Sequence, residues 1–323
     1  MIYPNPAQYS SFVEFLKREL ETHPVDVLLP IGYYSNVACS RSLTELNALT
    51  RIPVAPWRAM EIASNKTKTL TLAKSLGIHV PEDYPEPDRV RRFPAVMKAS
   101  LASGQLRYAR SPLELRQLYR DGMILQDYVP GDGYGFFALY RRGNAMAIFM
   151  HRRRREFPVT GGPSTSAESV LVPELRQVGL KLLDALKWHG AAMVEFKKDA
   201  RDGVFRLMEV NPKFWGSLDL AIASGVDFPY LATKLALSED FDPVFEYQTG
   251  LRFQWLLPDD IMHVLAAPKS FGALVRDYLD ERTRSNVWFR DVRPNLRQAA
   301  MTLGMVLASL RDDSRLYPHG KPT

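Results

Sequence analysis

Apolar positions along the chain follow two spacings, one typical of helices and one typical of short buried strands. Spacings of three and four residues predict helices over residues 11–20, 37–49, 66–76, 112–120, 173–186 and 296–310. Short apolar runs bounded by Pro, Gly or Asn predict strands over residues 25–29, 52–54, 94–99, 106–109, 123–129, 136–140, 145–150, 191–198 and 204–210. Strands with intervening helices, in two clusters, predict a mixed α/β and α+β fold whose subdomains surround a cleft.

One predicted hairpin carries charge on a single face. Pairing across its turn at residues 202–203 places Glu195 opposite Glu209, and side-chain alternation puts Asn211 on the face of Glu209. Opposed carboxylates repel each other, and the apolar sequence around them supplies no counter-charge. A divalent cation would resolve this conflict, and such oxygen ligands suit Mg²⁺ that also holds substrate phosphates. The alternative is that the glutamates face bulk water and Asn211 only begins an Asn-Pro turn.

Two other segments have the chemistry of a phosphate or nucleotide site. Lys98 ends an apolar strand, and the small residues that follow, including Ser103 and Gly104, can present backbone N–H groups to phosphate oxygens. Residues 126–129 end the next strand before a Pro-Gly turn, where main-chain groups could meet an adenine. Taken singly, each segment is also typical of an ordinary strand end.

Composition and charge narrow the class of protein. Of the residues, 46% are hydrophobic and 24% are charged. No apolar run approaches the ~20 residues that a membrane span needs, and the N-terminus lacks the charged and apolar regions of a signal peptide. The lone Cys39 excludes an internal disulfide, so a cytoplasmic protein is expected. The net charge of +6 is concentrated in a run of four arginines at residues 152–155.

Together and in this order, the segments resemble the ATP-grasp superfamily over about half of the chain, residues 65–227. The matching sequences are Asn-Lys at 65–66, Phe-Pro-Ala-Val-Met-Lys at 93–98, Leu-Gln-Asp-Tyr-Val-Pro-Gly at 125–131, Val-Glu-Phe-Lys at 194–197 and Met-Glu-Val-Asn-Pro-Lys at 208–213. The last is the most specific, because Glu-x-Asn-Pro followed by a cation is the metal and phosphate signature of the superfamily. Residues 155–162 resemble a loop of its carbamoyl-phosphate-synthase-like, predicted carboligase branch.

The resemblance implies an ATP-grasp fold, in which two α+β subdomains clamp ATP, preceded by a shortened α/β pre-grasp domain. The expected boundaries are 1–62 for the pre-grasp domain, 63–135 for the small subdomain, 136–255 for the large subdomain with the metal site, and 256–323 for a mainly helical C-terminal segment. It also implies a set of ligand-binding residues: Lys66, Lys98, Ser103, Gly104, Gln126, Asp127, Tyr128, Val129 and Asp132 for ATP, and Glu195, Glu209 and Asn211 for Mg²⁺ or Mn²⁺.

Some positions depart from the family pattern. Lys213 stands where the family usually has arginine, which keeps the charge but loses the bidentate guanidinium fork. Asp127 replaces the usual glutamate after the adenine strand, and Asp132 stands in for the acidic residue expected near the ribose. Such enzymes convert a carboxylate to an acyl phosphate that an amine, or less often a thiol, then attacks. The partners implied are therefore a small-molecule carboxylate and an amine or thiol.

The arginine run has two interpretations. In the first, Arg155 faces the cleft and binds an anionic substrate or the γ-phosphate, which makes it a candidate catalytic residue with Lys213, and the other arginines of the run are solvated. In the second, the run binds nucleic acid, but no stacking aromatics interleave it. We favour the first. His151 and His189 are interpreted as structural or solvated, and the helix at 296–310 as a packing helix or a homodimer contact.

Three functions remain open from the sequence. The leading hypothesis is an ATP-dependent carboxylate–amine or carboxylate–thiol ligase. The others are a unit that passes carbamoyl or carboxy phosphate to a partner, and a non-catalytic nucleotide-binding module.

Overall fold

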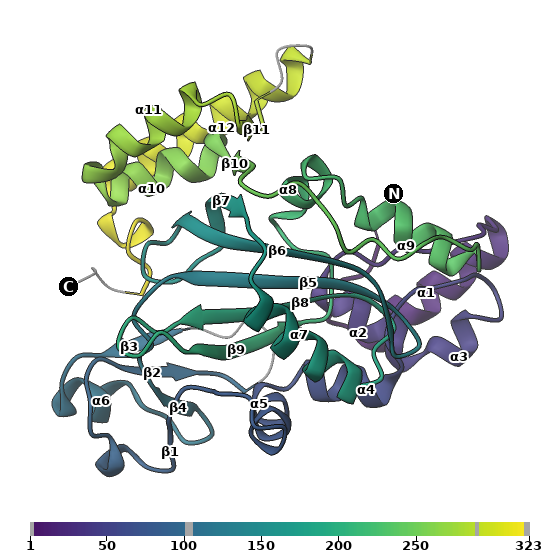
Figure 1. Cartoon of the computed structure of the whole chain (residues 1–323), viewed down its shortest axis with the longest axis horizontal. Coiled ribbons are helices and arrows are strands. Elements are labelled where there is room, and N and C mark those ends of the chain that lie inside the picture. Colours follow the sequence, from purple (N-terminus) through teal and green to yellow (C-terminus); the bar gives the residue numbers. More distant parts are fainter. Residues whose placement is uncertain (1–2, 101–105, 288–290, 320–323) are drawn as a thin grey trace.

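The computed structural model describes residues 3–100, 106–287 and 291–319. Over these ranges the strands form one seven-stranded and one four-stranded sheet, with helices around them (Figure 1). A search of the same residues for a helix with the length and apolarity of a membrane span finds none.

The large sheet lies at the centre of the molecule (Figure 1), with strand order β11-β10-β7-β6-β5-β8-β9. Helix α7 (Pro173–Ala185) covers one face, where Gly179 permits close packing because a Cβ there would lie 2.4 Å from the Phe136 ring. Helices α8 (Leu218–Ala223) and α9 (Phe228–Ala236) cover the other face around Phe137 and Phe149. The strands are β5 (Gly133–Arg141), β6 (Asn144–Glu156), β7 (Ser164–Ser169), β8 (Gly190–Lys198), β9 (Phe205–Asn211), β10 (Arg252–Gln254) and β11 (Thr283–Ser285).

The small sheet has the order β1-β4-β2-β3 and lies beside the β9 edge of the large sheet (Figure 1). Helix α5 (Lys66–Ser75) packs between the two sheets against β9, and Asn65 caps it by accepting a hydrogen bond from the Lys68 N–H. The remaining elements of this region are β1 (Asp83–Tyr84), β2 (Ala95–Lys98), β3 (Arg107–Ala109), α6 (Pro112–Leu118) and β4 (Ile124–Asp127).

The N-terminal region is mainly helical, with α1 (Tyr9–Thr22), α2 (Tyr33–Arg41), α3 (Leu43–Leu46) and α4 (Trp57–Ala63). The prediction of two strands at residues 25–29 and 52–54 is wrong. Within the described residues these segments share one parallel bridge, between Val27 and Arg51. Pro30 and Pro53 follow the bridge on the two segments, and a proline has no N–H with which to extend a ladder.

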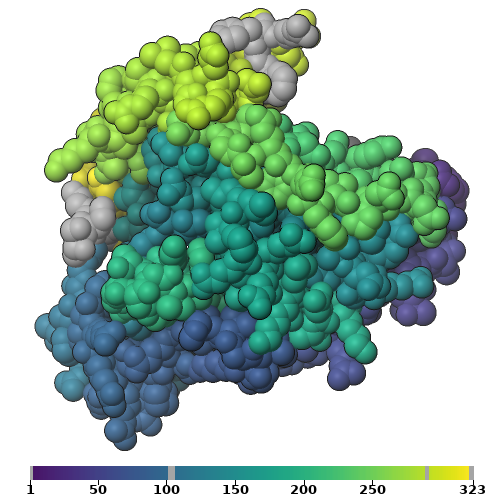
Figure 2. Space-filling model, in the orientation of Figure 1, coloured from purple at the N-terminus to yellow at the C-terminus, as the bar shows by residue number. Residues whose placement is uncertain are grey.

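The C-terminal segment is helical, as predicted, with α10 (Ile261–Ala266), α11 (Phe271–Leu279) and α12 (Val292–Arg311). It covers the β10 and β11 end of the large sheet, where it forms the yellow-green part of the surface in Figure 2. The sequence did not predict β7, β10 or β11. The Ser-Thr-Ser-Ala-Glu-Ser sequence of β7 has no apolar alternation, so its place in the sheet depends on pairing with β6 and β10.

Candidate functional site

At the open end of the β8–β9 hairpin the register is the predicted one, and a bulge between Glu195 and Phe196 shifts it by one residue nearer the turn. Glu195 pairs with Glu209, and Met193 pairs with Asn211. The Asn211 side-chain amide donates a hydrogen bond of 2.9 Å to Glu209 Oε1, which confirms that these two groups share a face. Two carboxylates and one amide oxygen therefore lie together at the end of the hairpin. No larger group of His, Cys, Asp or Glu side chains suited to a metal is present among the described residues.

Cations from distant elements neutralise the two glutamates. Arg153 Nη2, on β6, lies 2.7 Å from Glu195 Oε2, and Lys66 Nζ, on α5, lies 3.1 Å from Glu209 Oε2. Burial would raise the pKa of Glu209, but Lys66 and the Asn211 hydrogen bond outweigh it and hold that pKa below its usual value. The sequence next to Glu195 and Glu209 indeed supplies no counter-charge. The two cations that pair with these glutamates come from other elements, β6 and α5.

These groups line a cavity of about 420 Å³ between the two sheets. It brings together six of the residues predicted from the sequence: Lys66, Lys98, Glu195, Glu209, Asn211 and Lys213. The loop at Gly161 and Gly162 closes one side, and Trp215 and Ser217 lie on another. Ser103 and Gly104, predicted to bind phosphate, lie outside the described residues.

Two lysines of the cavity are partly dehydrated. Burial lowers the pKa of Lys98 to about 8 against the opposing effect of Glu209, and smaller contributions of Lys66 and Glu195 lower and raise it, respectively. Burial also lowers the pKa of Lys213, which Glu209 partly offsets. Lys98 forms no ion pair within 4.0 Å with another described residue. An anion in the cavity would supply the charge that this buried ammonium group lacks.

The Lys98 pKa predicts that anion binding weakens with rising pH. Only the protonated amine attracts phosphate, so the Kd of a non-hydrolysable ATP analogue should rise by about tenfold between pH 7 and pH 9, across the pKa of about 8. Isothermal titration calorimetry measures this change. Lys98→Arg should bind almost equally at both pH values, because a guanidinium group stays charged. An unchanged Kd in the native chain would show that Lys98 does not contact the ligand.

The segment predicted to hold adenine lies outside the cavity lining. The side chain of Gln126 is buried, and neither its Nε2 nor its Oε1 has a partner among the described residues. Asp127 accepts a 2.7 Å hydrogen bond from Arg201 Nη1, and Tyr128 lies under the Lys197 ammonium at 5.0 Å. Asp132 is exposed. The role of residues 126–129 in adenine binding and of Asp132 in ribose binding therefore stays a prediction.

Comparison with known proteins identifies the architecture. Residues 120–257 match the family described as "ATP-grasp in the biosynthetic pathway with Ter operon". The biotin carboxylase domain of Hydrogenobacter thermophilus 2-oxoglutarate carboxylase, solved with MgADP, ADP and bicarbonate, aligns over 78% of this chain and 62% of its own, with 16% identity and a TM-score of 0.64. The chain has the ATP-grasp fold.

Two further proteins resemble the chain over part of its length. An L-amino acid ligase from Bacillus licheniformis aligns over 71% of this chain and 60% of its own, with 18% identity and a TM-score of 0.58. Acetyl-CoA carboxylase 1 from Oryza sativa subsp. japonica is 24% identical over 185 residues, or 50% of this chain and 8% of that protein. The chain thus spans under a tenth of the curated relative's length.

The prediction that Arg155 faces the ATP-grasp cleft is wrong. Strand β6 has a bulge between Arg153 and Arg155, because Arg153 pairs with Ala167 of β7 and Arg155 pairs with Ser166. Adjacent β7 residues point to opposite faces, so the bulge turns Arg155 away from the cavity while Arg153 faces into it. Arg153, which the sequence interpretation treated as solvated, is the arginine of the site.

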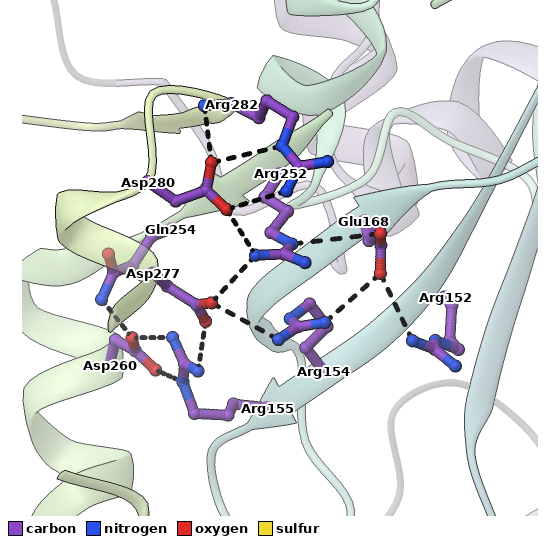
Figure 3. Close-up of polar contacts among 10 residues, drawn as sticks. All are labelled: Arg152, Arg154, Arg155, Glu168, Arg252, Gln254, Asp260, Asp277, Asp280 and Arg282. Carbon is purple, nitrogen blue, oxygen red and sulfur yellow. Dashed lines mark hydrogen bonds and ion pairs between the residues drawn. The ribbon is translucent and has the colours of Figure 1, made fainter. Parts of the chain in front are cut away.

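Arg155 belongs to a buried ion-pair network with the C-terminal segment (Figure 3). Its guanidinium lies 2.8 Å from both oxygens of Asp260 and 2.5 Å from Asp277 Oδ2. Arg152 and Arg154 both reach Glu168 of β7 at 3.3 Å. Arg154 also lies 3.4 Å from Asp277 Oδ1, so Arg154 and Arg155 join the sheet to the C-terminal helices, whereas the ion pair of Arg152 stays within the sheet.

His151 is a second residue of the cavity that sequence reasoning did not assign. Its ring is fully buried, lies edge-on to Phe137 at 4.7 Å and has no hydrogen-bond partner among the described residues. Burial, with a smaller effect of Arg153, lowers its pKa well below the usual value, so the imidazole is neutral. Burial excludes the solvated interpretation. The spacing of His151 and Arg153, two residues apart on one strand, is the signal that could have indicated a shared face.

Proposed function

We propose that this chain is an ATP-dependent ligase that activates a small-molecule carboxylate as an acyl phosphate for attack by an amine, or less often a thiol. The observation that carries the proposal is the gathering of three oxygen ligands and four cations around one cavity: Glu195, Glu209 and Asn211 with Lys66, Lys98, Arg153 and Lys213. The solved relatives support it, since one holds MgADP with bicarbonate and another is an amino acid ligase.

The donor set fits magnesium and nucleotide phosphates. Glu195, Glu209 and Asn211 supply the hard oxygen ligands that Mg²⁺ prefers, and they leave coordination positions for phosphate oxygens. When bound there, the ion would offset negative charge on the phosphates. Arg153 and Lys66 hold the two carboxylates in place. Loss of either cation would leave a buried carboxylate without its partner.

The cations of the cavity suit phosphoryl transfer to a carboxylate. A free carboxylate is a poor electrophile, and its acyl phosphate is a good one, so the transfer makes the later attack by an amine possible. Lys66 and Lys98 lie where they can bind phosphate oxygens and stabilise the charge that spreads over them during transfer. Lys213 supplies a third ammonium group from the end of β9. Enclosure by the Gly161–Gly162 loop limits the access of water to a labile intermediate.

ADP release tests the proposal. The purified chain is incubated with ATP, Mg²⁺ and a panel of carboxylates and amines, and we expect ADP formation that needs both partners. ADP formed with bicarbonate alone would instead identify a unit that makes carboxy phosphate, an alternative that the bicarbonate-bound relative favours. Mg²⁺-dependent ATP binding without any ADP would identify a non-catalytic module and contradict the proposal.

A further inference from the structure

A second pocket lies at the turn between β5 and β6, at the end of the large sheet away from the small sheet (Figure 1). Its volume is about 380 Å³, within the usual range for small-molecule sites. Glu195, in the cavity proposed to hold ATP, pairs with Gly135 of β5, and Arg141 lies about 20 Å further along that strand. We call this second site the β5–β6 pocket, and its lining residues are Asn47, Arg51, Ile52, Pro53, Arg141, Arg142, His189, Leu235, Ala236 and Ser238.

The lining of the β5–β6 pocket carries three arginines and no carboxylate. Arg141 is already paired, since its guanidinium lies 3.2 Å from Asp240 Oδ1 and donates a 2.9 Å hydrogen bond to the Glu239 carbonyl oxygen. Arg51 and Arg142 are exposed, and neither guanidinium has an ion pair or hydrogen bond with another described residue. Arg51 precedes α4 and Arg142 lies in the β5–β6 turn. Two unpaired positive charges from separate parts of the chain therefore line one pocket.

His189 adds a neutral donor to this pocket. Its Nδ1 accepts a 3.3 Å hydrogen bond from the Arg142 main-chain N–H, so Nε2 carries the proton of the neutral ring. Nε2 has no hydrogen-bond partner among the described residues and is not among their fully buried polar atoms, so it stays accessible. Burial lowers the pKa of His189, and Arg142 and Arg141 lower it further, as expected for a ring that lies near both charges.

We propose that the β5–β6 pocket binds the phosphate group of a small phosphate monoester with an apolar body. Such a group carries about two negative charges and three acceptor oxygens at neutral pH, which match the guanidinium groups of Arg51 and Arg142 and the Nε2–H of His189. A carboxylate has one charge and two oxygens, so it satisfies fewer of these donors. Ile52 and Leu235 supply apolar surface in the same lining. The site is separate from the proposed ligase chemistry, because it shares no lining residue with the cavity proposed to hold ATP.

Calorimetric titration of the full chain with phenyl phosphate tests the proposal. Mg²⁺ and a non-hydrolysable ATP analogue are present to occupy the other cavity. Saturable binding is expected, with benzoate at least about tenfold weaker and phenol weaker still, because benzoate has less charge and phenol has none. Equal affinity for phenol, or no saturable binding of phenyl phosphate, would overturn the proposal. Because binding and not turnover is measured, failure of this test is distinct from failure of the ligase assay.

Variants of the two unpaired arginines locate the binding. Arg51→Gln and Arg142→Asn each remove one guanidinium group and should weaken phenyl phosphate binding by roughly tenfold. Asparagine is used at residue 142 because the backbone φ there is 50°, which asparagine tolerates. Arg58→Gln, at an exposed arginine of α4 outside the pocket lining, is the matched control and should bind like the native chain.

Circular dichroism shows whether each variant is folded. Native affinity in folded Arg51→Gln and Arg142→Asn would place the ligand elsewhere and overturn the proposal. Binding that is lost in Lys98→Gln but kept in both arginine variants would assign phenyl phosphate to the cavity proposed to hold ATP, which also overturns it.

Discussion

Glu209→Gln is expected to lower Mg²⁺-dependent ADP release by roughly 10²–10³-fold. The substitution preserves the size of the side chain but removes the charge that would hold the metal and that pairs with Lys66 at 3.1 Å. Three neighbouring ammonium groups, those of Lys66, Lys98 and Lys213, would then lack this carboxylate. A coupled assay for ADP, run across Mg²⁺ concentrations, measures the effect, and excess Mg²⁺ should not restore the native rate.

The control for this prediction is Glu239→Gln. Glu239 is exposed, follows α9 and pairs weakly with Lys234 at 3.9 Å, so its substitution should leave ADP release unchanged. Thermal unfolding of both variants shows whether the protein assayed is folded. Native ADP release and native Mg²⁺-dependent ATP binding in folded Glu209→Gln would contradict both the metal site and the ligase proposal.

Arg155→Met should lower the free energy of unfolding by about 3–5 kcal/mol, because it leaves the buried carboxylate of Asp260 without its cation and removes the shortest of the ion pairs of Asp277. The side chains of Asp260 and Asp277 are almost fully buried against Arg155, so water cannot replace the lost guanidinium. ADP release per folded molecule should stay near the native value, since Arg155 does not line the cavity that contains Lys66, Lys98 and Glu209. Urea unfolding followed by circular dichroism gives the stability, and the ADP assay gives the activity.

Arg152→Met is the matched control on the same strand. Arg152 is partly exposed and its ion pair with Glu168, at 3.3 Å, is shared with Arg154, so its loss should cost less than about 1 kcal/mol. If Arg155→Met kept native stability but lost most of its ADP release, Arg155 would belong to the catalytic site. This result would contradict the conclusion that the β6 bulge turns Arg155 away from the cavity.

Prediction succeeded where short-range pattern decides structure. The hairpin of β8 and β9 was predictable because its two strands are neighbours in sequence. The predicted pairing of Glu195 with Glu209 is present, although a bulge between Glu195 and Phe196 shifts the register by one residue nearer the turn. The helix at α5 begins where its Asn cap predicts, which places Lys66 beside the site.

Prediction failed where distant segments meet. The β6 bulge depends on pairing with β7, a strand whose polar sequence gives little signal, so the sequence interpretation placed Arg155 in the cleft and left Arg153 solvated. Arg155 then finds its partners more than a hundred residues later, in Asp260 and Asp277. No local pattern around the arginine run indicates those carboxylates.

The sequence alone therefore predicted the ATP-grasp fold, through a family resemblance, and the gathering of Asn211 with the carboxylates of Glu195 and Glu209, through strand alternation on a hairpin. Tertiary structure decided which cations neutralise them. Lys66 lies on α5 and pairs with Glu209, and Arg153 lies on β6 and pairs with Glu195, where a bulge turns Arg155 away from the cavity. Buried charges pair with the groups that lie nearest in space. For these glutamates the nearest cations are far away in the sequence, so only the complete fold shows which residues they are.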